Sequence, residues 1–327
     1  MNPGVFDVID MMTGYQPAAA LTAAARLGVF DVLADAPLPA DAVAARLGTE
    51  PLATRALLDA LAGLGLLGTE DGGYTAAPVA RRLGRDGDLR LIAEKEAFFA
   101  EAWLSLADSV RTGRPRLDPW RSRLAAEPEQ VRRFLEALVV LARETGPDLT
   151  RLPGVGPGVR IADLGGGLGS YAVPLAAAGA RVTLVDLPPV AAWARDRLAG
   201  SGVPGQIEVR AVDLLGPDAA ERVGTDAGYD VVLLAHLLHD LGDDDCAAVL
   251  QVAATVCRRG GQVVVFELPG DPPGAFGPMF DLMMRVETEG RARRADELVA
   301  LLRAAGFTGV HESGAYRRPH GVFIASR

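Results

Sequence analysis

A dense cluster of glycines near the middle of the chain, in the stretch VRIADLGGGLGSY at 159–171, most constrains its fold. The apolar run before the glycines predicts a buried strand, and residues 170–178 after them predict a helix. Gly165, Gly167 and Gly169 permit a sharp turn between the two and let a ligand lie against bare backbone. A strand, a glycine turn and a helix N-terminus together form the unit that binds nucleotides in α/β proteins.

The second half of the chain alternates apolar runs with helix-like segments. The runs predict strands at 159–164, 182–185, 207–212, 229–234, 263–266, 310–312 and 321–325. This alternation predicts an α/β fold with a doubly wound, mostly parallel sheet, which binds ligands at the carboxyl ends of its strands. Asp186, Asp213 and Glu267 each follow one of these strands, and Gly260-Gly261 predicts a turn before the fifth. Asp186 stands about twenty residues after the glycines, where an acid that binds ribose hydroxyls is expected.

The glycines alone leave the identity of the ligand open. They can be read as GxGxG at 165, 167 and 169, or as a nicotinamide-type fingerprint, Gly167-x-Gly169-x-x-Ala172. An ordinary strand-to-helix turn is a third interpretation, and each acid after a strand also fits a helix N-cap.

Residues 1 to about 105 are helical by pattern. Asp41 is expected to cap a short helix. A small hairpin should follow at 66–75, which completes a winged-helix arrangement. The would-be recognition helix at 52–64 offers Arg55 as its only basic residue, and a reader of the DNA major groove needs more positive charge. The pattern therefore favours a dimerisation module.

Composition and length exclude several classes of function. A chain of 327 residues, 49% of them hydrophobic, has material for about two domains. Its net charge of −9 argues against nucleic-acid partners, because phosphate contacts need clustered positive charge. No apolar run approaches the ~20 residues of a membrane-spanning helix, and the N-terminus lacks a signal-peptide pattern. We therefore expect a cytoplasmic protein without membrane or nucleic-acid partners.

Six segments, in order, resemble motifs of the S-adenosylmethionine-dependent small-molecule O-methyltransferases of plant phenolic and bacterial antibiotic pathways. The segments are DLGGGLG at 163–169, VDLP at 185–188, VDLL at 212–215, LLHDLGDDD at 237–245, GGQVVVFE at 260–267 and LLRAAGF at 301–307. The resemblance covers nearly the whole chain. It implies a class I methyltransferase fold, which is Rossmann-like, with S-adenosyl-L-methionine as the cofactor and a homodimer formed by an N-terminal winged-helix domain.

The resemblance also implies a domain plan. The winged-helix dimerisation domain would cover 1–105, a helical region lining the substrate cleft 106–157, and the cofactor-binding methyltransferase domain 158–327.

The same resemblance assigns the cofactor-binding residues, which would be Asp163, Gly165, Gly167, Asp186, Leu187, Asp213 and Leu214. The two glycines would hold the methionine half of the cofactor, Asp186 the ribose, and Asp213 with its neighbour the adenine. The chemistry agrees, because a carboxylate accepts hydrogen bonds from both ribose hydroxyls and from an adenine amino group.

His239 is the general base that the resemblance implies. A neutral phenol is a weak nucleophile, and a side chain with a pKa near neutrality that takes its proton contributes about 10² to 10⁴ in rate. Bringing the hydroxyl close to the sulfonium methyl accounts for much of the rest. A carboxylate on the far ring nitrogen would hold the useful tautomer. Glu267 matches the family's partner for this role, and Asp240 is the local alternative.

Two departures from the family pattern fall near this base. Ala292 replaces the second glutamate that plant members carry in a G-K-E-R-T segment, and Ala235 replaces a lysine common four residues before the histidine. A 2-His-1-carboxylate metal site built from His236, His239 and Asp240 is conceivable, but we expect no metal and expect His236 to face the core.

The sequence thus predicts an O-methyltransferase of secondary metabolism, such as antibiotic biosynthesis. It would act on a hydroxyl of an aromatic or polyketide-like small molecule held between the helical domain and the sheet. The residues expected to line the substrate are Trp103, Phe134, Leu138, Met279 and Met283. The alternatives are a C- or N-methyltransferase, in one version metal-assisted on a keto acid, and a non-methylating member of the fold such as a decarboxylase, hydroxylase or cyclase.

Overall fold

The computed structural model describes residues 3–203, 205–224, 227–271, 274–316 and 319–327. The chain divides into two compact units, Met1–Ala100 and Glu101–Arg327. The division falls inside helix α7 (Leu89–Trp103), so the region 106–157 belongs to the second unit. The three-domain plan drawn from the sequence remains a prediction.

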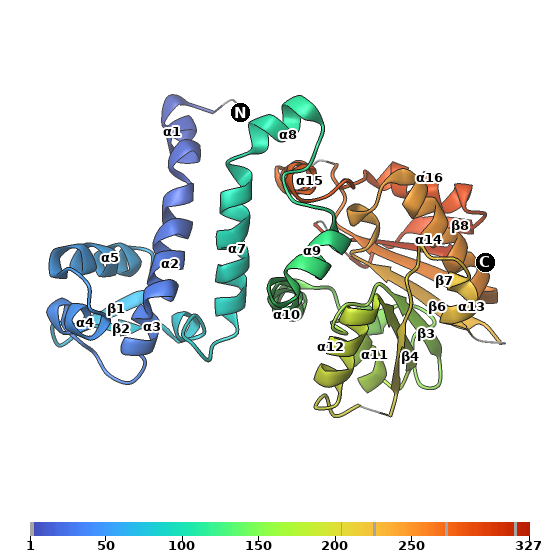
Figure 1. Cartoon of the computed structure of the whole chain (residues 1–327), viewed down its shortest axis with the longest axis horizontal. Coiled ribbons are helices and arrows are strands. Elements are labelled where there is room, and N and C mark those ends of the chain that lie inside the picture. The colour runs from blue at the N-terminus through green and yellow to red at the C-terminus, as the bar shows by residue number, and fades with distance from the viewer. Residues whose placement is uncertain (1–2, 204, 225–226, 272–273, 317–318) are drawn as a thin grey trace. The chain divides into compact units, whose positions relative to one another are not determined.

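The first unit is mainly helical with one small hairpin (Figure 1). Its elements are α1 (Val5–Thr13), α2 (Tyr15–Leu27), α3 (Val29–Val32), α4 (Ala40–Leu47), α5 (Pro51–Gly63), β1 (Leu67–Glu70), β2 (Gly73–Ala76), α6 (Pro78–Arg81) and most of α7. Phe30, Leu58 and Leu61 are almost fully buried at its centre. Asp41 was expected to cap α4, but the N-cap is Pro39 and Asp41 lies in the first turn, where its charge still favours the positive end of the helix dipole.

Helix α1 differs from the rest of the unit because none of its residues is buried. Its sequence, VFDVIDMMT, is nevertheless largely apolar, and Phe6 and Met12 are 83% and 72% exposed. The apolar residues of α1 are therefore exposed to an unusual degree for a helix of this composition.

The second unit is built around a seven-stranded sheet with the order β5-β4-β3-β6-β7-β9-β8 among the described residues. The strands are β3 (Arg160–Leu164), β4 (Arg181–Asp186), β5 (Ile207–Ala211), β6 (Tyr229–Ala235), β7 (Cys257–Glu267), β8 (Thr308–Glu312) and β9 (Gly321–Ser326). Strands β3 to β7 run parallel, and β9 pairs antiparallel with both β7 and β8. This is the doubly wound, mostly parallel sheet that the sequence predicted.

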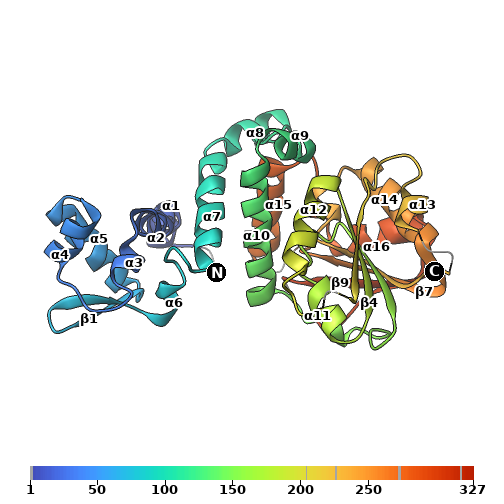
Figure 2. The same ribbon diagram turned by 60° about the horizontal axis from the view of Figure 1, so that its bottom comes forward.

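Helices cover both faces of this sheet (Figures 1 and 2). Helices α13 (Ala219–Val223), α14 (Asp243–Val256) and α16 (Ala295–Ala304) pack on one face, and α11 (Ala172–Ala177) and α12 (Pro188–Leu198) pack on the other. Alternate strand residues serve the two cores: Ala162 and Leu164 face α14, whereas Ile161 faces α11. Because both faces are buried, the strands are continuous apolar runs, which explains why they were visible in the sequence.

The remaining elements of this unit are α8 (Leu106–Thr112), α9 (Trp120–Ala126), α10 (Pro128–Thr145), the 3₁₀ helices η1 (Leu149–Arg151) and η2 (Leu238–Asp240), and α15 (Phe276–Glu287). The sequence placed the start of the fifth strand of the second half at 263, after a glycine turn. The structure instead begins β7 at Cys257, and Gly260 takes a φ of +71° within the strand. No helix of the described residues is both long and apolar enough to cross a membrane.

Candidate active site

The glycine turn after β3 brings bare backbone to the carboxyl edge of the sheet. Gly165, Gly167 and Gly169 all have positive φ, a conformation that favours glycine. A Cβ on Gly167 would point into open space. Gly166, which the sequence analysis did not single out, is needed for another reason, since a Cβ there would lie 2.7 Å from Oδ2 of Asp163. The turn therefore leaves room beside the main chain for part of a ligand.

Asp163 is the most unusual acid of the site. It is 1% exposed, and neither of its carboxylate oxygens has a hydrogen-bond partner among the described residues. Burial, together with the nearby carboxylate of Asp186, raises the pKa of Asp163 to about 7. A buried acid without partners is costly to ionise, so this position fits a cationic group of a ligand.

Asp186, the last residue of β4, lies across the glycine turn. Its Oδ2 accepts a hydrogen bond from the backbone N–H of Gly167 at 2.8 Å, and its Oδ1 accepts one from Leu187 at 2.7 Å. Burial raises the pKa of Asp186 to about 6, while the two N–H donors act in the opposite direction. Each oxygen keeps lone-pair capacity for a further donor such as a ribose hydroxyl.

Asp213 follows β5 and is held by a partner that the sequence did not reveal. Arg121 of α9 donates to both of its oxygens, at 2.5 and 2.6 Å, and the backbone N–H of Leu215 donates to Oδ1 at 2.9 Å. The guanidinium of Arg121 holds the pKa of this carboxyl below its usual range. Leu214, beside it, packs partly buried against the core under α14.

His239 lies on η2, directly after β6, and its closest side-chain partner is Glu267 at the end of β7. The distance from His239 Nδ1 to Glu267 Oε2 is 2.6 Å, whereas Asp240 Oδ1 lies 3.8 Å from Nε2. The hydrogen bond at Nδ1 leaves Nε2 as the nitrogen that can accept a proton. The histidine side chain is 11% exposed and the Glu267 side chain 4% exposed.

The buried carboxylate of Glu267 controls the charge of this histidine. Burial alone would lower the pKa of His239, but the charge and hydrogen bond of Glu267, together with the charge of Asp240, outweigh burial and raise the pKa to about 9. For Glu267, burial favours the neutral acid, but the charge and hydrogen bonds of His239, with the nearby ring of His236, outweigh it and lower the pKa. The pair is thus a hydrogen-bonded acid and base that share charge in a dry environment.

His236 was expected to face the core. Its ring lies 4.3 Å from that of Phe266 and 5.6 Å from that of His239, between centroids, and its φ is +54°. Burial lowers its pKa to about 4, so the ring is neutral at physiological pH. One nitrogen or oxygen atom from each of His236, His239 and Glu267 lies within 4.8 Å of the others, the grouping among the described residues that comes nearest to a metal site.

The expected substrate-lining residues fall into separate groups. Phe134 and Leu138 of α10 pack in one cluster with Leu168 of the glycine turn and with Leu187. Trp103 is the half-buried last residue of α7.

The two methionines expected to contact the substrate, Met279 and Met283, lie one turn apart on α15. The same helix carries Phe280, which the sequence analysis missed and whose ring lies 5.2 Å from that of His239, edge to face. The contact places an aromatic side chain of α15 directly beside the imidazole.

Comparisons with known proteins show the family of this chain. The family model described as "O-methyltransferase domain" matches residues 103–308, and the one described as "O-methyltransferase dimerisation domain" matches residues 9–86. A 3-hydroxy-5-methyl-1-naphthoate 3-O-methyltransferase from Streptomyces sahachiroi is 31% identical over 313 residues, covering 91% of this chain and 88% of the relative. A phenazine O-methyltransferase from Lysobacter antibioticus is 30% identical, covering 92% and 90%.

A solved structure shows the same likeness in three dimensions. The human N-acetylserotonin methyltransferase, crystallised in complex with S-adenosylmethionine, aligns with a TM-score of 0.84 at 26% identity, covering 100% of this chain and 98% of that one. Fold and glycine turn thus define a class I, S-adenosyl-L-methionine-dependent methyltransferase. Within that class, the chain belongs to the O-methyltransferase family, as an enzyme with that family's dimerisation domain at its N-terminus.

Proposed function

We propose that this O-methyltransferase acts on a phenolic hydroxyl of an aromatic or polyketide-like small molecule, with His239 as the general base. The hydrogen bond of 2.6 Å between His239 Nδ1 and Glu267 Oε2 is the observation that carries the proposal. It fixes the imidazole so that Nε2 is free to accept a proton. The naphthoate and phenazine named in the two bacterial relatives are both aromatic, which supports the substrate class.

The residues around the glycine turn fit the cofactor. The unpartnered carboxylate of Asp163 suits the α-ammonium group of the methionine half, and the open space beside Gly167 leaves room for it. Asp186 would bind the ribose hydroxyls, with Leu187 fixing the acid through its N–H. Asp213 would accept from the adenine amino group, beside Leu214.

When bound, S-adenosyl-L-methionine supplies an electrophilic methyl group on its sulfonium sulfur. His239 would take the proton of the substrate hydroxyl at Nε2 and become an imidazolium. The hydroxyl oxygen would gain the methyl group to give the methyl ether, and the bond between methyl and sulfur would break, so that the cofactor would leave as the neutral thioether S-adenosyl-L-homocysteine. The carboxylate of Glu267 stabilises the imidazolium across the Nδ1 hydrogen bond. Holding the reactants together supplies much of the remaining acceleration.

Apolar side chains suit an aromatic acceptor. Phe280 sits against His239, and Met279 and Met283 of the same helix offer flexible thioethers that adapt to irregular rings. Phe134 and Leu138, packed near the glycine turn, are the proposed contacts on the side of α10, and Trp103 is a further candidate.

Substitution of the base tests the proposal. His239→Ala should lower kcat for a phenolic acceptor by about 10² to 10⁴, because the oxygen must then attack while still protonated. The binding of S-adenosyl-L-methionine, followed by calorimetry, should stay unchanged. The assay would use a panel of phenols, carboxylic acids and keto acids with labelled cofactor and mass spectrometry of the products. Undiminished methylation of a phenol by His239→Ala would refute the general base.

A metal-assisted reaction is the competing hypothesis, motivated by the grouping of His236, His239 and Glu267. Ligand atoms about 2.0–2.2 Å from a tetrahedral metal ion lie about 3.3–3.6 Å apart, whereas Nδ1 and Oε2 are 2.6 Å apart, the distance of a short hydrogen bond. We therefore favour the hydrogen-bonded pair. Metal analysis of the purified protein, and activity that survives chelation, would separate the two hypotheses.

We further propose that the protein is a cytoplasmic homodimer assembled through its first unit. The exposed apolar face of α1 and the match to a dimerisation domain support this assembly. The free thiols of Cys246 and Cys257 are consistent with a reducing compartment. Arg55, the one base of the would-be recognition helix, lies 3.3 Å from Asp41, an ion pair that weakens the case for nucleic acid.

A further inference from the structure

The short helix η2 that carries His239 is fixed from its N–H side by Glu267. Oε1 of this carboxylate accepts hydrogen bonds from the backbone N–H groups of Leu238, at 2.8 Å, and of His239, at 3.2 Å. The carbonyl oxygen of Leu238 accepts a hydrogen bond from the backbone N–H of Leu241 within the turn, at 3.3 Å. The thiol of Cys246 also contacts the carbonyl oxygens of Leu238 and Leu241, at 3.3 and 3.6 Å, and both oxygens have lone pairs for a further donor. Any further donor to these two carbonyl oxygens therefore helps to hold η2 in place.

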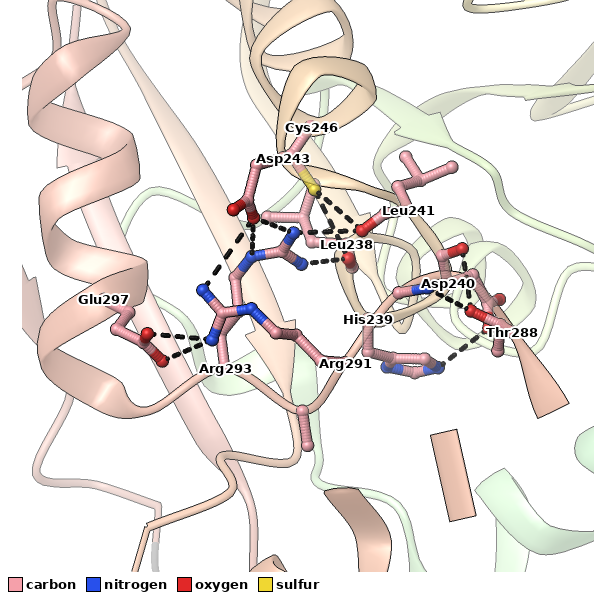
Figure 3. A network of polar contacts seen from close by, with 12 residues as sticks. Leu238, His239, Asp240, Leu241, Asp243, Cys246, Thr288, Arg291, Arg293 and Glu297 are labelled. Carbon is pink, nitrogen blue, oxygen red and sulfur yellow. Dashed lines mark hydrogen bonds and ion pairs between the residues drawn. The ribbon is translucent and has the colours of Figure 1, made fainter. Parts of the chain in front are cut away.

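Arg293 binds them (Figure 3). Its Nη1 donates to the carbonyl oxygen of Leu238 at 2.6 Å, and its Nη2 donates to that of Leu241 at 2.9 Å. Nη2 and Nε also contact Oδ1 of Asp243, at 2.5 and 3.2 Å. The Arg293 side chain is only 2% exposed, so the whole guanidinium group is enclosed by these partners.

The geometry uses properties that only a guanidinium group has. A planar fork of donors can reach two carbonyls and a carboxylate at once, whereas a lysine ammonium is a point charge on a flexible stem. The charges also match the turn: Glu267 is an anion at its N–H end, and Arg293 is a cation at its carbonyl end. Because the carboxylate of Asp243 pairs with the buried cation, the arrangement avoids an unpaired charge.

The segment around Arg293 packs on the turn by its backbone as well. A Cβ on Gly290 would lie 2.1 Å from the carbonyl oxygen of His239, so only glycine fits there. The hydroxyl of Thr288 donates to the carbonyl of Asp240 at 3.0 Å. Ala292, which replaces the family's second glutamate, is buried in the same segment. The segment therefore touches the turn through backbone, hydroxyl and guanidinium groups rather than through a second carboxylate.

We propose that Arg293 is a positioning residue for methyl transfer, which holds η2 by its carbonyls so that the His239 ring keeps its alignment with Glu267. The inference rests on the proposed role of His239 as base. We call this arrangement the clamp: the anion Glu267 and the cation Arg293 hold η2 from opposite sides, with His239 between them. Loss of the cation end should misplace the ring without altering the cofactor site.

Two substitutions and a matched control test the clamp. Arg293→Met removes the donors and should lower kcat by about 10²-fold, the size of effect expected when a reacting group moves by about 1 Å. Arg293→Lys keeps the charge beside Asp243 but cannot bridge both carbonyls, so its kcat should fall less. The control is Arg291→Met. Arg291 donates to Glu297 at 2.8 Å and approaches Asp243 at 3.8 Å, and among the described residues it donates to no carbonyl of the turn. Its kcat should stay close to that of the parent enzyme.

The pH profile separates positioning from a general loss of structure. In both Arg293 variants, the acid limb of the kcat/KM profile should move to lower pH, because the carboxylate is less well aligned to stabilise the imidazolium. The dissociation constant of S-adenosyl-L-methionine should not change. If Arg293→Met does not fold, Arg293→Lys carries the same two readouts. An unchanged profile with parent-like kcat in Arg293→Lys, or an equal fall in Arg291→Met, overturns the clamp.

The activity of His239→Ala, measured in parallel, distinguishes failure of the clamp from failure of the proposed general base. If that variant loses activity while the Arg293 variants do not, the clamp fails and the general base stands. If His239→Ala keeps full activity, the base fails, and the clamp fails with it.

Discussion

At the scale of single residues, the pairing of His239 with a buried carboxylate determines the pH range in which His239 can accept a proton. The imidazole accepts a proton only while it is neutral, and Glu267 raises its pKa to about 9. Below that pH the protonated, inactive form dominates the free enzyme. We therefore predict that kcat/KM rises with pH and levels off near pH 9.

Glu267→Gln should shift that profile. Glu267 is the partner that raises the pKa of His239 most, so without its carboxylate the pKa falls below its present value and the acid limb moves to lower pH. The plateau of kcat should fall by about 10²-fold, because the imidazolium formed in the reaction loses its counter-charge. Steady-state rates between pH 6 and 10 would measure both changes.

Asp240→Asn is the matched control for this prediction. The Asp240 carboxylate also raises the pKa of His239, but it is 3.8 Å from Nε2 and makes no hydrogen bond to the ring, so the amide should move the acid limb to lower pH by less than Glu267→Gln does. A profile that responds more to Asp240→Asn than to Glu267→Gln would reassign the partner of the base.

Single residues also show which parts of the candidate site could be predicted from the sequence. The acids and the histidine were visible because each directly follows a strand, which is a local pattern. Arg121 and Arg293 were not, since their partners lie 92 and 55 residues away along the chain. The sequence at 291–294 does not indicate which of its arginines is buried, and only the contacts in the folded structure identify Arg293.

At the scale of elements, strands buried on both faces were predicted well, and the short segments between them less well. Residues 257–262, with two arginines and two glycines, resemble a turn, yet they extend β7 because Cys257 pairs with Tyr229 and Gln262 with Val231. Here pairing with a neighbouring strand overrides local preference.

A further prediction concerns Arg121 of helix α9. Its guanidinium group binds both oxygens of Asp213, the carboxylate that we propose binds the adenine. Arg121→Ala should speed the association of S-adenosyl-L-methionine, since the guanidinium that must share or leave Asp213 is gone. The ion pair is partly exposed and worth up to about 1 kcal/mol, so the gain should be about fivefold at most. Stopped-flow fluorescence would measure it. Slower association or weaker binding would mean that Arg121 contacts the cofactor itself.

At the scale of the whole molecule, we expect the exposed apolar residues of α1 to form part of the proposed dimer interface. A nine-residue helix with no buried residue lacks tertiary support of its own. We predict that the double substitution Phe6→Asp and Met12→Asp shifts the homodimer toward monomer, as measured by analytical ultracentrifugation. Leu52→Asp, at a residue 75% exposed on α5, is the control and should leave the dimer intact. A dimer that persists in the α1 variant would place the interface elsewhere.

The buried carboxyl group of Asp163, which has no hydrogen-bond partner among the described residues, has a consequence for its proposed role in binding the ammonium group of the cofactor. With a pKa of about 7, the empty protein carries a proton on this acid for much of the time. An incoming ammonium group must expel that proton to take its place. We therefore expect the affinity for the methyl donor to fall as the medium becomes more acidic than about pH 7.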